Sequence, residues 1–475
     1  MILENFQDNS TQRKPGTSKG GFLANVVRKP EVVLFGLLIV VLGTLIWESD
    51  GFYRWDEGAH FVFDASALQS PTVSLGVWQR FGGVWLFTLP AQLGHKAVKV
   101  FASALFLLAV VLTYKVAELE EIPGKHWVIV LLGFQPAFLD IGYTCMAELP
   151  AALILVLSYY LYKKSEWKWS LFTASLVFLF RYEMYFFALI MVVLAWRKKQ
   201  FRALPWIVAG PAIWYCFSVF WTNDLLWLPR EMLRYGRLAK YEEGASLFHY
   251  VIKAPEIFGW APVVLFVAAV VYGVVRKRLD SPILLLTVFL NLLISTLASS
   301  EIFHWTGAVG DIRYLVPIIP FFALVSLRGL FVVTDRIKLS RGLAMIPIGF
   351  AAWLIVQTVS YGEPHTFSEY EKAVISLTQR AAVDSIDTPI LTNHWAAQYA
   401  MLSGMADTRK ILKISNELFD SAPRVYVLWD PQLAVSPFAT HTLKLADMRE
   451  NRSIQLVDSA AVLDKTIFLF LKAER

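Results

Sequence analysis

Long apolar runs recur along this chain, and they restrict its fold more than any other feature. A lipid bilayer has a hydrocarbon core about 30 Å thick, which a helix crosses with roughly 20 apolar residues. The composition agrees, because 56% of the residues are hydrophobic and only 17% are charged, too few for an ordinary water-soluble globule. A cytosolic enzyme, a nucleic-acid-binding module and a disordered chain are therefore excluded. We expect an all-α polytopic membrane protein with eleven membrane helices, over residues 31–48, 97–115, 126–145, 148–162, 169–180, 184–196, 204–221, 256–275, 281–298, 314–330 and 342–361.

The last part of the chain has a different character. It is polar, and its short apolar runs predict strands that alternate with helices. The predicted strands include 389–391, 424–429 and 466–471, and the predicted helices 370–382 and 396–404. We predict three regions: an N-terminal tail over 1–30, a transmembrane catalytic domain over 31–361 with a long first outer loop at 49–96, and a small soluble α/β domain over 362–475.

The distribution of lysine and arginine predicts the orientation in the membrane. Positive residues concentrate in the short loops on the cytoplasmic side of membrane proteins. With eleven spans, 21 Lys and Arg residues fall in cytoplasmic segments and 11 in outer segments before residue 362. We therefore expect a cytoplasmic N-terminus and an extracytoplasmic C-terminal domain. Because the positive residues lie between apolar segments, the net charge of +6 does not indicate a nucleic-acid partner.

The apolar segment from Trp169 to Trp196 carries basic clusters at both ends. A single helix would place one of these clusters on the wrong side of the membrane, whereas two short helices that meet at Arg181-Tyr182-Glu183 would not. A turn at that depth must be buried in protein or line a wet cavity. An intramembrane Arg or Glu costs about 3 kcal/mol, so we expect a function for this pair. An ion pair that only holds two helices together is the alternative.

The first predicted outer loop carries Trp55-Asp56-Glu57 soon after the first span. Adjacent carboxylates next to a membrane are costly unless they face water or a partner. If this stretch is helical, Asp56, His60 and Asp64 share one face at i, i+4 spacing. Such a set could bind a divalent cation or supply a general base. A solvated loop with a helix N-cap is the alternative.

Two later outer segments carry ionisable residues where spans begin. Glu148 starts one span, where the helix dipole favours an acid whatever its function. His304, Asp311 and Arg313 lie at the outer edge of another span. Arg313 could bind a phosphate together with nearby backbone N–H groups, and snorkelling to lipid headgroups is the alternative.

Motifs for nucleotide or zinc chemistry do not occur in the sequence. It has no GxGxxG after a strand, no Walker loop, no HExxH and no CxxC pair. The acids, the histidines and the C-terminal domain instead lie on the predicted outer side. An enzyme built this way needs an energy-rich substrate that is already outside, and a lipid-phosphate-linked sugar meets that need.

Together these features resemble the GT-C superfamily, the multi-spanning glycosyltransferases that use polyprenyl-phosphate sugars. The resemblance covers about residues 31–361, and the C-terminal domain is similar to that of some members only. It rests on the order and sidedness of four motifs: Trp55-Asp56-Glu57, Glu148 ahead of a span, the hairpin tip Arg181-Tyr182-Glu183-Met184, and Arg313-Tyr314-Leu315-Val316-Pro317-Ile318-Ile319-Pro320 at the start of a late span.

The resemblance implies roles for the acids. Asp56 or Glu57 would be the general base on the acceptor hydroxyl, or would help to place a divalent metal ion such as Mg²⁺ or Mn²⁺. Glu148 would orient the acceptor or the metal ion, so a metal site, if there is one, would use Asp56 and Glu148. Because Asp56 and Glu57 adjoin, the sequence does not decide which is the base.

The resemblance also implies that basic residues stabilise the leaving phosphate. Arg313 would do so together with Arg181 and His304, in a site with little water. Three further residues are expected to support these groups: His60, Glu183 and Asp311.

We therefore expect an integral-membrane glycosyltransferase that uses an inverting mechanism. It would move a sugar from a polyprenyl-phosphate donor to a lipid-linked glycan, a lipid or a protein on the outer face of a membrane, which we expect to be the bacterial inner membrane. One alternative is a flippase or transporter for a lipid-linked glycan, which should show internal repeats and broken helices near the midplane; the sequence shows no convincing repeat. A non-catalytic membrane scaffold is another, and it does not explain Arg181 and Glu183.

Overall fold

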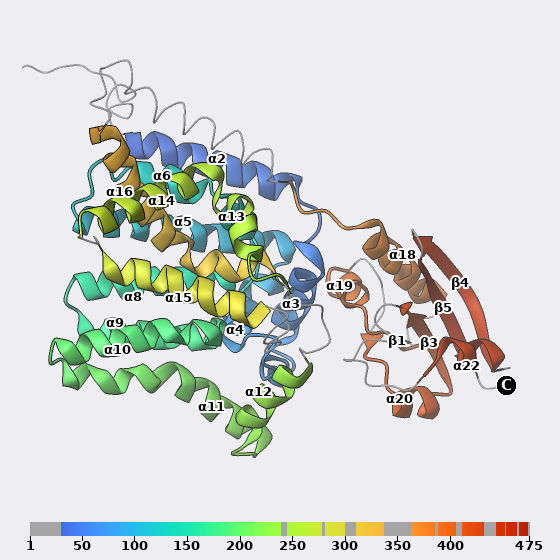
Figure 1. Ribbon diagram of the computed structural model, residues 1–475. Helices are drawn as coiled ribbons and strands as arrows, with labels where there is room; N and C mark the ends of the chain where they lie inside the picture. Colours follow the sequence, from blue (N-terminus) through green and yellow to red (C-terminus); the bar gives the residue numbers. More distant parts are fainter. Residues whose placement is uncertain are drawn as a thin grey trace, which may run out of the picture.

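The computed structural model consists of a bundle of helices with a small α/β domain at one end (Figure 1). It describes residues 30–238, 245–277, 281–299, 310–336, 363–384, 388–404, 411–431, 443–451, 453–462 and 465–473. Residues 1–29 of the predicted tail, the predicted span 342–361 and His304 lie outside the described residues. We call the end of the bundle that carries the α/β domain the proximal end, and the other the distal end.

Five stretches of helix in the described part of the chain are long and apolar enough to cross a membrane, and a bent pair would add a sixth. The chain is therefore an integral membrane protein, and the predicted count of eleven spans stays a prediction. The five are α2 (Pro30–Glu48), α5 (His95–Leu119), η3 (Phe201–Val208) with α11 (Ala209–Thr222), α15 (Pro282–Ser299), and η5 (Ile312–Ile318) with α16 (Ile319–Arg336). The bent pair is α13 (His249–Phe258) and α14 (Trp260–Val275), at 116°.

The predicted span 126–145 is divided into two short helices, α6 (Trp127–Gly133) and α7 (Pro136–Ile141). Proline favours an extended backbone in the residue before it, and Gln135 has φ −75° and ψ 131°. The helix therefore ends just before Gln135 and restarts at Pro136. Hydropathy does not reveal this break, because it lies inside an apolar run of the sequence. Phe134 and Gln135 are both buried in the structure.

The predicted hairpin is present in the bundle. Helix α8 (Glu148–Lys163) is followed by α9 (Trp167–Phe180), the single 3₁₀ turn η2 (Tyr182–Met184) and α10 (Tyr185–Arg197). Arg181 ends α9 with φ −142° and ψ 87°, outside the helical region. The hairpin thus places its polar tip among buried apolar side chains such as Phe180 and Met184.

Helix α3 (Arg54–Ser66) lies at the proximal end, beside the α/β domain (Figure 1). A Cβ atom on Gly58 would meet the ring of Trp395 at 2.4 Å. Only glycine therefore lets the domain pack this closely on α3. Near α3 the chain also forms η1 (Pro71–Ser74) and α4 (Phe81–Gln92), and α12 (Trp227–Leu238) follows α11.

The C-terminal domain is a five-stranded sheet with the order β2-β1-β3-β5-β4. Strand β1 is parallel to β2 and β3, whereas β5 is antiparallel to β3 and β4. In the register, Tyr426 lies opposite Ile390 on one side and Leu471 on the other. The elements are α18 (Glu369–Asp384), β1 (Ile390–Leu391), α19 (Trp395–Leu402), β2 (Ile411–Leu412), α20 (Asn416–Ser421), β3 (Arg424–Trp429), α22 (Leu445–Glu450), β4 (Ile454–Val462) and β5 (Lys465–Ala473). The predicted fold class, a helical membrane protein with a small C-terminal α/β domain, is confirmed.

Candidate active site

Asp56 and Glu57 are adjacent in α3, but their side chains belong to different clusters. Successive residues of a helix point about 100° apart. Asp56 Oδ2 pairs with Arg313 Nη2, and its side chain keeps 23% of its exposure. Glu57 is fully buried and lies 3.9 Å from Lys99 Nζ. The structure therefore brings Asp56, and not Glu57, to the arginines.

Arg313 is held at the start of η5 by the residue that caps this helix. Asp311 accepts a hydrogen bond from the Arg313 backbone N–H at 3.0 Å, and its Oδ2 lies 3.0 Å from Arg313 Nε. The same guanidinium pairs with Asp56 and lies 3.6 Å from Glu148 Oε1. One arginine thus joins acids from three segments that are far apart in the sequence.

Arg181, at the tip of the hairpin, reaches the same acids from inside the bundle. Its Nη2 pairs with Glu148 Oε1, and its Nη1 lies 2.7 Å from Glu183 Oε1. Arg181 is 4% exposed and Glu148 is fully buried. Buried charges persist only when they are paired, and here the tip of the hairpin and the first residue of α8 neutralise each other. The predicted residues Arg181, Glu183, Glu148, Asp311 and Arg313 are all brought together.

Arg80 belongs to this cluster, although sequence reasoning did not single it out. Its Nη1 lies 3.6 Å from Glu183 Oε2, and its guanidinium lies 4.8 Å from the centre of the Tyr182 ring. Arg80 has φ +60°, a conformation that costs a non-glycine residue free energy and that often occurs at functional sites. Its only signal in the sequence is a basic residue inside an apolar stretch of the first outer loop. We use the term arginine cluster for Arg80, Arg181 and Arg313 with their acids Asp56, Glu148, Glu183 and Asp311.

In the arginine cluster, where three arginines face four acids, Arg313 offers a donor to an anionic ligand. Arg313 Nη1 is buried and has no hydrogen-bond partner among the described residues. A guanidinium presents its donors in a rigid fork that matches two oxygens of a phosphate. Arg54 lies at the rim of the cluster, 3.5 Å from Asp311 Oδ2, with 58% of its side chain exposed. The cluster therefore combines buried cations with an exposed edge.

His60 does not join this cluster. Its ring stacks on Trp78 with ring centres 5.0 Å apart, and the residue is 7% exposed. Burial, opposed by the charge of Asp56, lowers the pKa of His60 to about 3. His60 is therefore neutral at physiological pH and supports the wall of the site. Asp64 is buried as well, and burial raises its pKa well above the usual value.

The residues as placed do not fit the divalent cation that the resemblance left open, with Asp56 and Glu148 as its ligands. Asp56 and Glu148 both contact the Arg313 guanidinium, and Glu148 also pairs with Arg181. A dication between these acids would lie directly beside two positive charges. Within the described ranges, no group of three or more His, Cys, Asp or Glu side chains is placed to hold a metal ion.

Glu57 instead ties α3 to the segment that leads into the C-terminal domain. Besides Lys99, it lies 3.8 Å from His365 Nδ1 and accepts a hydrogen bond from the Cys145 N–H at 3.3 Å. His365 Nε2 in turn lies 3.1 Å from Asp140 Oδ1. This second cluster joins α3, α5 and the bundle to residue 365, and its position indicates a structural role for Glu57.

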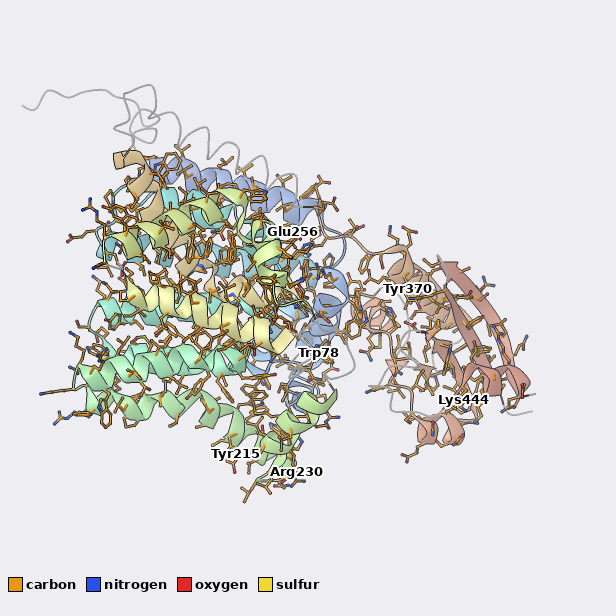
Figure 2. All side chains as sticks on the ribbon, viewed as in Figure 1. Trp78, Tyr215, Arg230, Glu256, Tyr370 and Lys444 are labelled. Atoms are coloured by element: carbon orange, nitrogen blue, oxygen red, sulfur yellow. The ribbon has the colours of Figure 1, made fainter. Side chains whose placement is uncertain are left out.

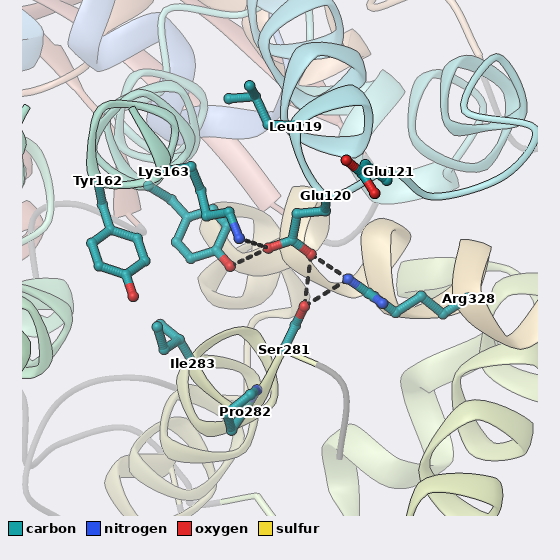
Figure 3. A pocket seen from close by; sticks show the side chains of 10 residues that line it. Leu119, Glu120, Glu121, Tyr162, Lys163, Ser281, Pro282, Ile283 and Arg328 are labelled. Atoms are coloured by element: carbon teal, nitrogen blue, oxygen red, sulfur yellow. Dashed lines mark hydrogen bonds and ion pairs between the residues drawn. The ribbon is translucent and has the colours of Figure 1, made fainter. Parts of the chain in front are cut away.

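A pocket of about 460 Å³ (Figure 3) is lined by Lys163 and other residues. Lys163 ends α8 and Glu148 begins it, so the pocket lies at the distal end of the bundle, away from the arginine cluster. Its centre is Glu120, which accepts hydrogen bonds from Tyr159 and from Ser281 at 2.6 Å, and which pairs with Lys163 and Arg328. These groups come from or adjoin α5, α8, α15 and α16. Each Glu120 oxygen already has two partners. We therefore assign these contacts a structural role in linking the helices, and the pocket is not the candidate active site.

No protein-family model and no curated protein matches the sequence. Two crystal structures of ArnT from Cupriavidus metallidurans, one bound to undecaprenyl phosphate and one in the apo state, are similar to this chain with TM-scores of 0.61 and 0.63. Each comparison covers 93% of this chain and 98% of ArnT, at 9% sequence identity. At this identity the likeness concerns the fold alone. The resemblance seen in the sequence is confirmed at the level of the fold, which is similar to that of ArnT.

Proposed function

We propose that the chain is a membrane glycosyltransferase of the GT-C type that takes its sugar from a polyprenyl-phosphate carrier. The observation that carries the proposal is the convergence of Arg80, Arg181 and Arg313 with Asp56 at the proximal end. A fold similar to that of a protein crystallised with undecaprenyl phosphate supports it. The positive-inside bias supports an extracytoplasmic proximal end, and we place the protein in a bacterial inner membrane.

In this proposal the phosphate of the carrier binds between the arginines. Its oxygens take the buried donor at Arg313 Nη1 and compete with the acids for the other guanidinium groups. Asp56 is then released from Arg313 and turns toward the acceptor. Glu148 and Glu183 keep Arg181 in place from the opposite side.

The proposed reaction is a single displacement. The acceptor hydroxyl oxygen attacks the anomeric carbon of the donor sugar while the bond from that carbon to the phosphate oxygen breaks, which inverts the configuration. The hydroxyl proton passes to Asp56, and the bonding electron pair leaves with the polyprenyl phosphate. The arginines stabilise the charge that develops there.

Binding of undecaprenyl phosphate to the detergent-purified full-length protein tests the phosphate site. Arg313→Ala should raise the Kd about 10- to 100-fold, because a hydrogen bond to a charged group contributes about 1.5–3 kcal/mol. The control is Arg230→Ala on α12, where the side chain is 65% exposed and pairs with Asp224. Equal affinity of the wild type and Arg313→Ala would contradict the proposal.

Turnover separates transfer from transport. Asp56→Asn should lower the release of undecaprenyl phosphate from the sugar-loaded carrier by about 10²- to 10⁴-fold, the usual contribution of a general base. A flippase would keep moving loaded carrier across vesicles in this variant and would release no free carrier. That outcome would contradict the proposed transferase function and would favour a transporter.

A further inference from the structure

Two tryptophans form an aromatic platform at the rim of the arginine cluster. Trp55 and Trp78 have ring centres 5.5 Å apart, and Trp55 is 40% exposed. His60 and Phe63 support Trp78 from behind, with ring centres at 5.0 and 5.6 Å. Figure 2 shows Trp78 at the end of the bundle that faces the C-terminal domain. The platform, defined as Trp55 and Trp78, is therefore rigid underneath and open on the side of Trp55.

The platform adjoins the proposed chemistry on both sides. Trp55 precedes Asp56, which pairs with Arg313, and Trp78 lies two residues before Arg80. One turn further along α3, the C-terminal domain covers Gly58 through Trp395. Trp78 stacks on His60, which lies one turn along α3 from Asp56, so a ligand on the platform lies near Asp56.

We propose that this platform binds a sugar ring of the acceptor, so that the acceptor is a saccharide or carries one at its reactive end. The inference rests on the proposed function. The apolar face of a pyranose ring stacks on an indole, while its hydroxyl groups reach charged groups at the edge of the site. Arg54 and Asp56, the neighbours of Trp55 in the sequence of α3, carry such charged groups. The carrier phosphate binds deeper, at the buried arginines.

A contact with the membrane surface is the competing explanation for an exposed tryptophan. Trp47, Trp196 and Trp260 fit that explanation, because they lie at the ends of apolar helices and are more than half exposed. Trp55 lies on α3, which is not among the candidate spans, and its neighbours Arg54 and Asp56 are charged. These neighbours favour a polar ligand with an apolar face over lipid.

Saturation-transfer NMR on the purified full-length protein tests the platform with the methyl glycosides of glucose, galactose, mannose and N-acetylglucosamine as probes. At least one probe should receive saturation at its ring protons in the presence of undecaprenyl phosphate. Trp55→Ala should raise its Kd on the order of tenfold, and Trp55→Phe by less, because a smaller ring remains. Trp221→Ala is the matched control, since Trp221 is 41% exposed at the proximal end of α11.

Three results would overturn the inference. In the first, no probe binds the wild type, and in the second, Trp55→Ala binds the probe as the wild type does. In the third, undecaprenyl phosphate weakens binding of the probe, and the Trp55 variants also change the affinity for undecaprenyl phosphate. In the last case the platform belongs to the carrier. Undecaprenyl phosphate binding to the wild type is measured in parallel. If it is normal while the platform fails, the proposed function stands; if the wild type does not bind the carrier, the proposed function itself fails.

Discussion

The variants Glu57→Gln and Asp56→Asn, made separately, test the roles of two adjacent acids. Glu57 is assigned a structural role, and Asp56 is proposed as the general base. Glu57 is fully buried, and its main cationic partner Lys99 is 1% exposed. Glutamine keeps the shape but leaves Lys99 without a counter-charge at that point. Removing one partner of a buried pair costs about 3–5 kcal/mol. We therefore expect Glu57→Gln to destabilise the protein.

The size of the effect on the melting temperature follows from the chain length. Unfolding entropy is about 2.1 cal/mol/K per residue, or about 1 kcal/mol/K for 475 residues. Glu57→Gln should therefore lower the Tm by about 3–5 °C. Asp56→Asn should change the Tm by about 1 °C or less, since Arg313 keeps Asp311 and Glu148 as partners. Transfer should fall about 10²- to 10⁴-fold in Asp56→Asn only.

A double variant checks the reason for the loss. Glu57→Gln with Lys99→Met removes both charges, and it should recover at least about half of the lost stability, because no buried charge is left unpaired. Thermal unfolding in detergent and carrier release are measured on the same preparations. If Glu57→Gln keeps the wild-type Tm and loses transfer while Asp56→Asn keeps transfer, the reasoning is refuted and the roles of the two acids are reversed.

Three other predictions concern single positions. Arg80→Gly should lower the Tm, because it removes the buried guanidinium that pairs with Glu183 and lies over Tyr182, and relief of the positive φ of 60° offsets only part of this loss. It should also weaken undecaprenyl phosphate binding by about tenfold; unchanged binding would remove Arg80 from the site. The pKa of His60 is lowered by burial to about 3, so its contribution to stability is present at pH 7 and falls as the pH drops below about 6.5 toward 3, by about 2 kcal/mol at pH 5. His60→Phe should reduce the loss of Tm between pH 7 and pH 5, and an identical loss in both proteins would contradict this. Glu120→Gln should lower the Tm by about 3 °C, because it weakens the contacts to Lys163 and Arg328, and it should leave undecaprenyl phosphate binding unchanged; weaker binding would show that the distal pocket acts on the proximal end.

Much of the fold follows from local patterns in the sequence. Apolar runs predict membrane helices because lipid offers no partner for polar groups. Basic flanks on both sides of 169–196 predict a hairpin because both flanks favour the cytoplasmic side of the membrane. The strand predicted at 424–429 coincides with β3, and the strand predicted at 466–471 lies within β5. The break at Gln135 is not apparent in hydropathy, because it occurs inside an apolar run.

The sequence by itself determined that the chain is a membrane protein, and that ionisable residues such as Glu148 and Arg313 stand at the edges of apolar runs. These properties depend on each residue and its immediate neighbours. Only the tertiary structure decided that Arg80 joins the arginines, that His365 secures Glu57, and that Asp56 alone of its pair reaches Arg313. Such pairings depend on which helix faces are buried against each other, and burial makes an unpaired charge so costly that side chains from distant segments must meet.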